Sequence, residues 1–197
     1  MRVLSFDIEE WFHLLDHPET RSEAQWKTFE ARFEQNLERV LSIVSRCNVK
    51  ATFFCLGWVA EQYPHLIRKI SDDGHEVACH SSRHQLAYQQ TPDEFRADFR
   101  AAKDAISDAT GITVDTYRIP GFSLTQESIW ALDILGEEGV EVDCSVFPAV
   151  RGHGGCALVC CFHQAGTTTS CNDKVLIRWV RVPLHRPLRD LCGQLGH

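Results

Sequence analysis

The amino-acid sequence predicts an α/β fold built around a parallel sheet, and three features support this prediction. Short runs of β-forming residues alternate with longer segments in which apolar side chains recur every three or four positions. About five strand-and-helix units fit into residues 1–145, with helices long enough for right-handed crossovers between parallel strands. Helix-capping residues stand at several expected helix ends. These features are typical of an open doubly wound sheet or of part of a barrel.

The first strand and helix are expected within the opening quarter of the chain. Residues 2–6 form a short apolar run that ends at Asp7, which is typical of a buried strand. Ser22 and Gln25 have the spacing of a capping box, so a helix is expected to begin there and to end at Asn48. One buried stripe is predicted along this helix, formed by Trp26, Phe29, Phe33, Leu37, Val40, Leu41 and Val44.

The next two expected strands are joined by a helix in two parts. Residues 49–56 are dense in β-forming side chains, and residues 75–79 form a further short strand. Between them a helix is predicted from Trp58 onwards. Pro64 divides this helix, and Gly74 stands at its C-terminal cap.

The following helix has a complete N-terminal signature. Thr91 stands at the N-cap, Pro92 at the first helical position and Glu94 at the third. Gly111 is expected to end this helix. The remaining elements are a strand at 114–118, a helix at 126–138 and a strand at 140–143.

Composition and charge restrict the class of protein. The chain has 197 residues, of which 44% are hydrophobic and 24% charged, and this suits one globular domain with a core. Its net charge of −7 argues against nucleic acid and anionic membranes as partners, because both attract basic surfaces. No apolar run approaches the ~18 residues of a membrane span, and the N-terminal residues lack the apolar segment of a signal peptide. We therefore expect a cytoplasmic protein without a transmembrane segment.

The last part of the chain departs from the strand-and-helix pattern. From Cys156 to Cys171 neither a helical stripe nor a strand alternation can be followed. The cysteines there leave a zinc knuckle as an alternative, although their spacing fits no standard pattern. We predict a partial domain over residues 1–155 and an atypical tail over 156–197, which is disordered or read out of frame from near Gly155.

Polar residues gather at the carboxyl ends of the expected strands. In a parallel α/β fold these ends lie on one face, where ligands bind. The sequence therefore predicts a functional site on this face, although its residues are far apart in the chain. The residues at these ends include Asp7, Glu9, Glu10, His80, His84, Arg118, Pro120 and Asp143.

Two histidines four positions apart indicate a metal site. A helical turn would place the imidazoles of His80 and His84 on one side. With a nearby carboxylate they supply two nitrogen ligands and one oxygen ligand, which leaves a tetrahedral ion an open position for water. This ligand set suits zinc or another first-row ion better than calcium or magnesium. The alternative is that both histidines are polar loop residues.

The acidic residues after the first strand divide into two groups. Asp7 and Glu9 share a face while the chain is extended, so one could bind a metal while the other handles a proton. Glu10 is turned away by the same alternation and is expected to be solvated. Arg118 could hold Asp7 through a charge-assisted pair. The alternatives are solvated acids, a helix cap and a surface arginine.

Five ordered motifs resemble a known family. The segments are SFDIEEWF (5–12), KATFFCLGW (50–58), GHEVACHSSRH (74–84), YRIPGFS (117–123) and DCSVFP (143–148). Together they resemble the polysaccharide deacetylases with a NodB homology domain, in particular the subfamily found with exopolysaccharide and exosortase loci. The resemblance covers about residues 1–155.

This resemblance implies a fold and a reaction. The fold is a distorted, incomplete (β/α) barrel, truncated here after about five β/α units. The reaction is the metal-dependent hydrolysis of N-acetyl groups from an amino-sugar polysaccharide or oligosaccharide, with zinc as the expected metal. By position, Asp7 matches the catalytic base, and Arg118 matches the arginine that tethers it. The metal ligands implied are Glu9, His80 and His84.

The resemblance also points to substrate contacts. Pro120 matches the wall of the substrate groove, and Asp143 falls in a motif whose role is less settled. Aromatic residues beside the motifs could stack on sugar rings, although aromatic side chains are more often core residues. These aromatic residues are Trp11, Phe12, Trp58 and Phe122.

One part of the family pattern is missing from the readable sequence. The family's last motif supplies a histidine, preceded two positions earlier by a leucine, as general acid for the leaving amine. Pro183, Leu184 and His185 are only superficially similar to it. Three functions therefore stay open: a deacetylase, a non-catalytic or vestigial glycan-binding domain, and a cyclic-amide hydrolase that uses the same metal site.

Overall fold

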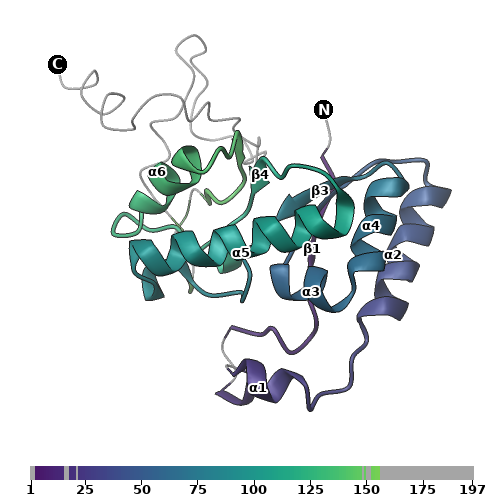
Figure 1. Ribbon diagram of the computed structural model, residues 1–197, viewed down its shortest axis with the longest axis horizontal. Helices are drawn as coiled ribbons and strands as arrows, with labels where there is room; N and C mark the ends of the chain where they lie inside the picture. The colour runs from purple at the N-terminus through teal and green to yellow at the C-terminus, as the bar shows by residue number, and fades with distance from the viewer. Residues whose placement is uncertain (1–2, 16–17, 21, 148, 150–151, 156–197) are drawn as a thin grey trace, which may run out of the picture.

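The computed structural model describes residues 3–15, 18–20, 22–147, 149 and 152–155, and it has the α/β fold that the sequence predicts (Figure 1). Five parallel strands form one sheet in the order β1-β2-β3-β4-β5. Because this order never reverses, the sheet lacks the switch point of a doubly wound fold and corresponds to part of a barrel. The strands are β1 (Ser5–Ile8), β2 (Thr52–Cys55), β3 (Glu76–Cys79), β4 (Thr116–Tyr117) and β5 (Val142–Asp143).

The longer helices lie against the sheet, whereas α1 lies apart from it (Figure 1). The longest helix, α5, runs across the molecule and packs against α3, α4 and α6 (Figure 1). Phe53 of β2 and Phe99 of α5 are fully buried in the core between the two layers. The α-helices are α1 (Glu23–Trp26), α2 (Phe33–Arg46), α3 (Gly57–Gln62), α4 (Pro64–Asp72), α5 (Pro92–Thr110) and α6 (Trp130–Glu137). Three 3-10 helices are η1 (Pro18–Thr20), η2 (Ala87–Gln89) and η3 (Pro120–Phe122).

The helix starts and ends predicted for the middle of the chain are confirmed. Pro64 separates α3 from α4, and Thr91 and Glu94 form a complete capping box at the start of α5. Gly111 follows α5 with a φ of 77°, the left-handed conformation expected at a helix end. The strands are shorter than predicted, and β1 extends over 5–8 instead of 2–6, so Asp7 lies within it.

The single helix predicted from Ser22 to Asn48 is wrong. The chain forms the short helix α1, leaves the helical conformation and restarts at Phe33. Ser22 makes no side-chain cap hydrogen bond, so the capping-box prediction also fails. The physical cause is Glu10, whose carboxylate accepts hydrogen bonds from the backbone N–H groups of Arg32 and Phe33 at 2.9 and 3.0 Å. A buried acceptor at this point caps a new helix, as a residue at the N-cap would.

The prediction that Glu10 is solvated is therefore wrong as well. Glu10 is only 3% exposed. Period-two alternation does turn Glu10 away from Asp7, but toward the side on which Ile8 is buried and not toward solvent. Glu10 links the segment after β1 to the start of α2.

Replacing Glu10 by alanine is expected to lower the free energy of unfolding by about 2–4 kcal/mol. The change removes a helix cap and leaves buried N–H groups without an acceptor. Urea denaturation followed by circular dichroism measures the effect. Glu34→Ala, which removes an exposed carboxylate from the first turn of the same helix, is the matched control. Equal stability losses in the two variants would contradict the capping role of Glu10.

Predictions about the tail fall beyond the part of the chain that the structure describes. The predicted tail over 156–197, its cysteine cluster and the segment 183–185 all lie there, so these predictions and the domain division after residue 155 stay predictions. Within the described ranges, no helix has the length and apolar character needed to cross a membrane.

Candidate active site

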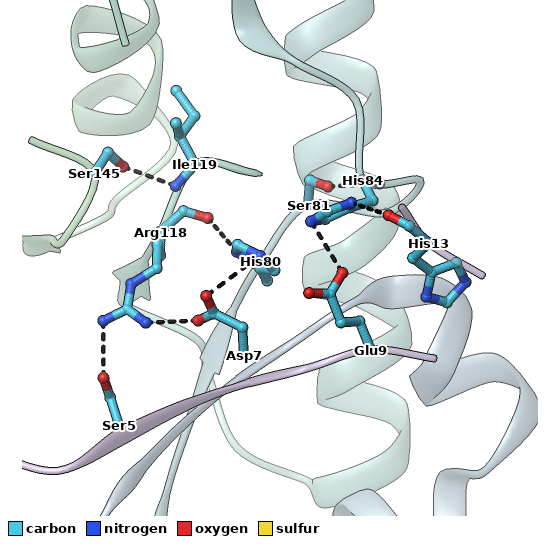
Figure 2. A network of polar contacts seen from close by, with 10 residues as sticks. All are labelled: Ser5, Asp7, Glu9, His13, His80, Ser81, His84, Arg118, Ile119 and Ser145. Atoms are coloured by element: carbon cyan, nitrogen blue, oxygen red, sulfur yellow. Dashed lines mark hydrogen bonds and ion pairs between the residues drawn. The ribbon is translucent and has the colours of Figure 1, made fainter. Parts of the chain in front are cut away.

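Four polar side chains predicted from the sequence converge at the carboxyl ends of β1 and β3 (Figure 2). Asp7 lies in β1 and Glu9 just after it, while His80 and His84 belong to the loop that follows β3. Glu9 Oε2 lies 3.1 Å from His84 Nε2, and Asp7 Oδ2 lies 4.0 Å from His80 Nε2. The centres of the two imidazole rings are 5.1 Å apart. The topology of the sheet thus brings these residues together.

Backbone carbonyls fix the orientation of both imidazoles. His80 Nδ1 lies 2.8 Å from the carbonyl oxygen of Arg118, and His84 Nδ1 lies 2.8 Å from that of His13. A carbonyl oxygen only accepts, so each Nδ1 carries the proton. Burial lowers the pKa of both histidines, which favours the neutral rings. Each Nε2 therefore presents a lone pair toward the acidic side chains.

The contact between Glu9 and His84 requires a positive species. A carboxylate oxygen and an imidazole lone pair are both acceptors, and at 3.1 Å they repel each other unless a proton or a cation lies between them. Among the described residues, Glu9 Oε2 has no hydrogen-bond partner. Burial, followed by the charge of Asp7, raises the pKa of Glu9 to about 8, so a proton fills this role when no cation is bound.

The donor set fits a zinc-like ion. Two imidazole nitrogens and one carboxylate are typical ligands of catalytic zinc, and hydrogen bonds from each Nδ1 to a carbonyl are typical of its surroundings. Two ligand atoms that each lie ~2.0–2.1 Å from a tetrahedral zinc ion are about 3.3 Å from each other. The distance between Glu9 Oε2 and His84 Nε2 is close to this value, at 3.1 Å. In the described part of the chain no three such side chains already form a compact metal-binding group.

The loop that carries the histidines is not the helical turn that their spacing predicts. Ser81 and His84 both have left-handed backbones, with φ values of 69° and 55°. The Oγ of Ser81 accepts a hydrogen bond from the backbone N–H of His84 at 3.0 Å. The rings still point to one side because each is held by its own carbonyl, not because of helical geometry.

Arg118 anchors Asp7 from the opposite side, as the sequence predicts. Its guanidinium donates to Asp7 Oδ1 at 2.5 Å and to Ser5 Oγ at 3.0 Å, and the group lies over the ring of Phe54, 3.8 Å from its centre. Arg118 is 4% exposed, whereas the Asp7 side chain is 31% exposed. Asp7 is therefore held in place while one side of its carboxylate stays accessible.

Asp143 lies beneath the segment that follows Arg118. It is 4% exposed, and its carboxylate accepts from the Oγ and N–H of Ser145 at 2.5 and 3.0 Å. Ser145 Oγ in turn accepts from the N–H of Ile119 at 2.8 Å. Asp143 thus supports the backbone between Arg118 and Pro120, and its predicted contact with substrate stays a prediction.

Asp143 is expected to give the protein a measurable pH dependence. Burial raises its pKa from 3.8 to about 6 against the opposing hydrogen bonds of Ser145. The folded state therefore keeps this proton at pH values where the unfolded chain has lost it, so the carboxyl's contribution to stability falls as the pH rises from about 4 to about 6. Asp143→Asn, which cannot ionise, should flatten this part of the stability profile in urea titrations. If the free energy of unfolding of Asp143→Asn falls between about pH 4 and 6 as steeply as that of the unchanged protein, Asp143 is not the group responsible.

The aromatic residues near the site divide by burial. Phe12 and Trp58 are core residues with exposures of 1% and 4%, so neither offers a face to a sugar ring. Trp11 is 45% exposed, and its Nε1 donates to the carbonyl of Glu30. Phe122 is half-buried, with its ring 5.6 Å from the guanidinium carbon of Arg118. Trp11 and Phe122 therefore remain the candidates for stacking.

Sequence reasoning missed residues that support this site. Glu10 donates its N–H to His13 Nδ1, and the carbonyl of His13 holds His84. Asp98 on α5 accepts hydrogen bonds from the histidine loop. A half-buried acid on an amphipathic helix has no local signature, so no sequence signal distinguishes Asp98 from its exposed neighbours.

A cleft lined by both polar and apolar side chains lies beside His84. Its volume is about 460 Å³, which is within the range of small-molecule sites. Side chains of the segment after β1 and of the loop after β3 form its walls. The residues around it include His13, Thr20, Glu23, Trp26, Arg83, Gln85, Gln89 and Gln90.

Comparisons with known proteins identify relatives of this chain. A peptidoglycan N-acetylglucosamine deacetylase of Bacillus cereus is 25% identical over 117 residues, which cover 53% of this chain and 42% of that protein. A peptidoglycan N-acetylglucosamine deacetylase of Listeria monocytogenes is 40% identical over 82 residues, which cover 41% of this chain and 17% of that protein. This chain therefore spans less than half the length of these two curated relatives.

A solved structure shares the fold. A candidate polysaccharide deacetylase of Mycobacterium smegmatis superposes with a TM-score of 0.63 at 22% sequence identity. The match covers 78% of this chain and 56% of that one.

A family model identifies the family. The model described as Polysaccharide deacetylase matches residues 17–140, which is more than half of the chain. The matched range contains His80, His84 and Arg118 and begins after Asp7 and Glu9. On this match the chain belongs to the polysaccharide deacetylase family.

Proposed function

We propose that this chain carries the metal centre of a hydrolase that removes N-acetyl groups from an amino-sugar polysaccharide. One observation carries the proposal: two imidazole lone pairs face two carboxylates at the carboxyl end of a parallel sheet, and an arginine anchors one of these carboxylates. Glu9, His80 and His84 would hold the ion. A bound zinc ion would supply Lewis-acid polarisation of the acetamide carbonyl and would lower the pKa of a water from ~15.7 toward ~7.

The residues of the chain would then handle the proton and the geometry. Asp7 is the base, because it is accessible, close to His80 and anchored by Arg118. It takes a proton from the water that attacks the acetamide carbon. The C–N bond then breaks, acetate forms, and the leaving nitrogen takes a proton from solvent to become a free amine, while Asp7 returns its proton to solvent. Arg118 keeps the Asp7 carboxylate aimed at the attacking water.

The substrate class rests on the relatives and on the cleft. The relatives from Bacillus cereus and Listeria monocytogenes are named for N-acetylglucosamine units of peptidoglycan. The cleft beside His84 is bordered by the exposed side chains of Gln85 and Gln89, whose amides match the hydroxyl groups of a sugar. We therefore propose an N-acetylglucosamine-containing polymer or oligomer as the substrate.

A second function is a domain that binds metal and glycan without catalysis, and it is supported by the place of the expected general acid in the chain. The histidine that the family resemblance implies as general acid has no counterpart among the described residues, and the superficially similar segment 183–185 lies outside them. Loss of a general acid typically costs ~10²–10⁴ in rate. A chain without this group would bind metal and glycan but would hydrolyse slowly or not at all.

Metal content and acetate release separate these two functions. The full chain is loaded with zinc, dialysed and measured by emission spectroscopy, and acetate is then followed with a chitin hexamer. We expect one zinc per chain and steady acetate release. Bound zinc without acetate would support the glycan-binding alternative, and a chain that retains no zinc would overturn the proposed function.

A further inference from the structure

The loop that carries the two histidines is held from outside by one acidic side chain. Asp98 lies on α5, and its two carboxylate oxygens accept hydrogen bonds from consecutive backbone N–H groups of the loop. Asp98 Oδ2 lies 2.8 Å from Ser82 N, and Asp98 Oδ1 lies 3.0 Å from Arg83 N. Both contacted residues fall between His80 and His84. One carboxylate thus fixes two successive peptide groups in the middle of the loop.

The same loop is held on its carbonyl side by the start of α3. The N–H of Gly57 donates to the carbonyl of Ser81 at 2.9 Å, and the N–H of Trp58 donates to that of Ser82 at 3.1 Å. There is little space for adjustment here, because a Cβ on Gly57 would lie 2.7 Å from the Cα of Ala102. Ala102 lies one turn after Asp98 on α5. The loop is therefore clamped between two helices that pack closely together.

The loop needs such support because its backbone is unusual. Ser81 and His84 are both non-glycine residues with positive φ. Side chains disfavour this conformation, so it persists only where surrounding contacts impose it. The hydrogen bonds to Asp98 lie between these two residues and directly oppose relaxation of the segment.

We propose that Asp98 is a positioning residue for the metal centre: it holds the loop in the conformation that brings the Nε2 atoms of His80 and His84 within reach of one ion. This inference rests on the proposed function. Asp98 touches neither imidazole and acts only through the backbone of Ser82 and Arg83. Its contribution therefore concerns the geometry of the ligands and not the chemistry of the reaction.

Substitution of Asp98 in the full chain tests this role. Zinc affinity is measured by competition with a chromophoric chelator, and cobalt-substituted protein reports ligand geometry through its visible spectrum. Asp98→Ala is expected to weaken zinc binding by about 10–100-fold, the usual effect of removing a group that orients metal ligands. It should also alter the cobalt spectrum. Asp98→Asn keeps one acceptor oxygen, so we expect partial rescue of affinity, and this variant serves if the alanine variant does not fold.

Thr91→Ala is the matched control. It removes the capping box of the same helix without touching the loop. This variant should lose stability and keep the zinc affinity and cobalt spectrum of the unchanged protein. If the Asp98 variants bind zinc within about twofold of the unchanged protein, the positioning role is overturned while the metal centre stands. If the unchanged protein binds no zinc, the proposed function itself fails.

Discussion

Replacing His84 by alanine is expected to abolish stoichiometric zinc binding and, with it, acetate release. His84 supplies one of the two Nε2 lone pairs at the site, and its Nε2 is 3.1 Å from the Glu9 carboxylate. Without it, Glu9 and His80 remain as a two-ligand set, which is fewer than the three protein ligands of known catalytic zinc sites. The loss of affinity should exceed the ~10–100-fold typical of residues that only orient the ligands.

Thermal unfolding gives a readout of this prediction that does not depend on catalysis. A ligand that binds only the folded state stabilises it in proportion to ln(1 + [L]/Kd), so excess zinc should raise the midpoint temperature of the unchanged protein. His84→Ala should show no such increase. His65→Ala removes an exposed histidine from α4 and should respond to zinc as the unchanged protein does. A zinc-dependent increase that persists in His84→Ala would contradict the assigned ligand set.

The start of α5 was predicted correctly from a local signal, whereas the capping box at Ser22 and the start of α2 were not. The start of α5 depends on residues within one turn, Thr91 to Glu94, so its capping box is visible in the sequence. The start of α2 depends on a carboxylate more than twenty positions earlier in the chain. Apolar spacing continued across residues 27–32, so the periodicity alone favoured one unbroken helix. Only the tertiary contact from Glu10 identifies the break.

The location of the site was predictable from the topology of the sheet. In a parallel sheet the carboxyl ends of all strands lie on one face, so Asp7, His80 and Arg118 could be brought together from strand order alone. The details were not predictable in the same way. The conformation of the histidine loop depends on contacts from α3 and from Asp98, and nothing in the spacing of His80 and His84 distinguishes this loop from a helical turn.

Asp7→Asn is expected to separate metal binding from catalysis. The amide has nearly the shape of the carboxylate but is not basic, so the proton of the attacking water has no acceptor at this position. We expect acetate release to fall by about 10²–10⁴-fold, the usual contribution of a general base. The zinc content should stay at one per chain, because Glu9, His80 and His84 are unchanged.

Asp7→Asn could also lower stability, because the buried Arg118 loses its charged partner in this variant. Its guanidinium keeps the hydrogen bond to Ser5 and the contact with the ring of Phe54, so the folded state should survive with a lower midpoint of thermal unfolding. Asp72→Asn, an exposed substitution on α4, gives the baseline for both rate and stability. Loss of zinc together with activity in Asp7→Asn would make Asp7 a ligand instead of the base. Undiminished acetate release would exclude it from the reaction, because a group that accepts the proton of the attacking water cannot lose its basicity without slowing that step.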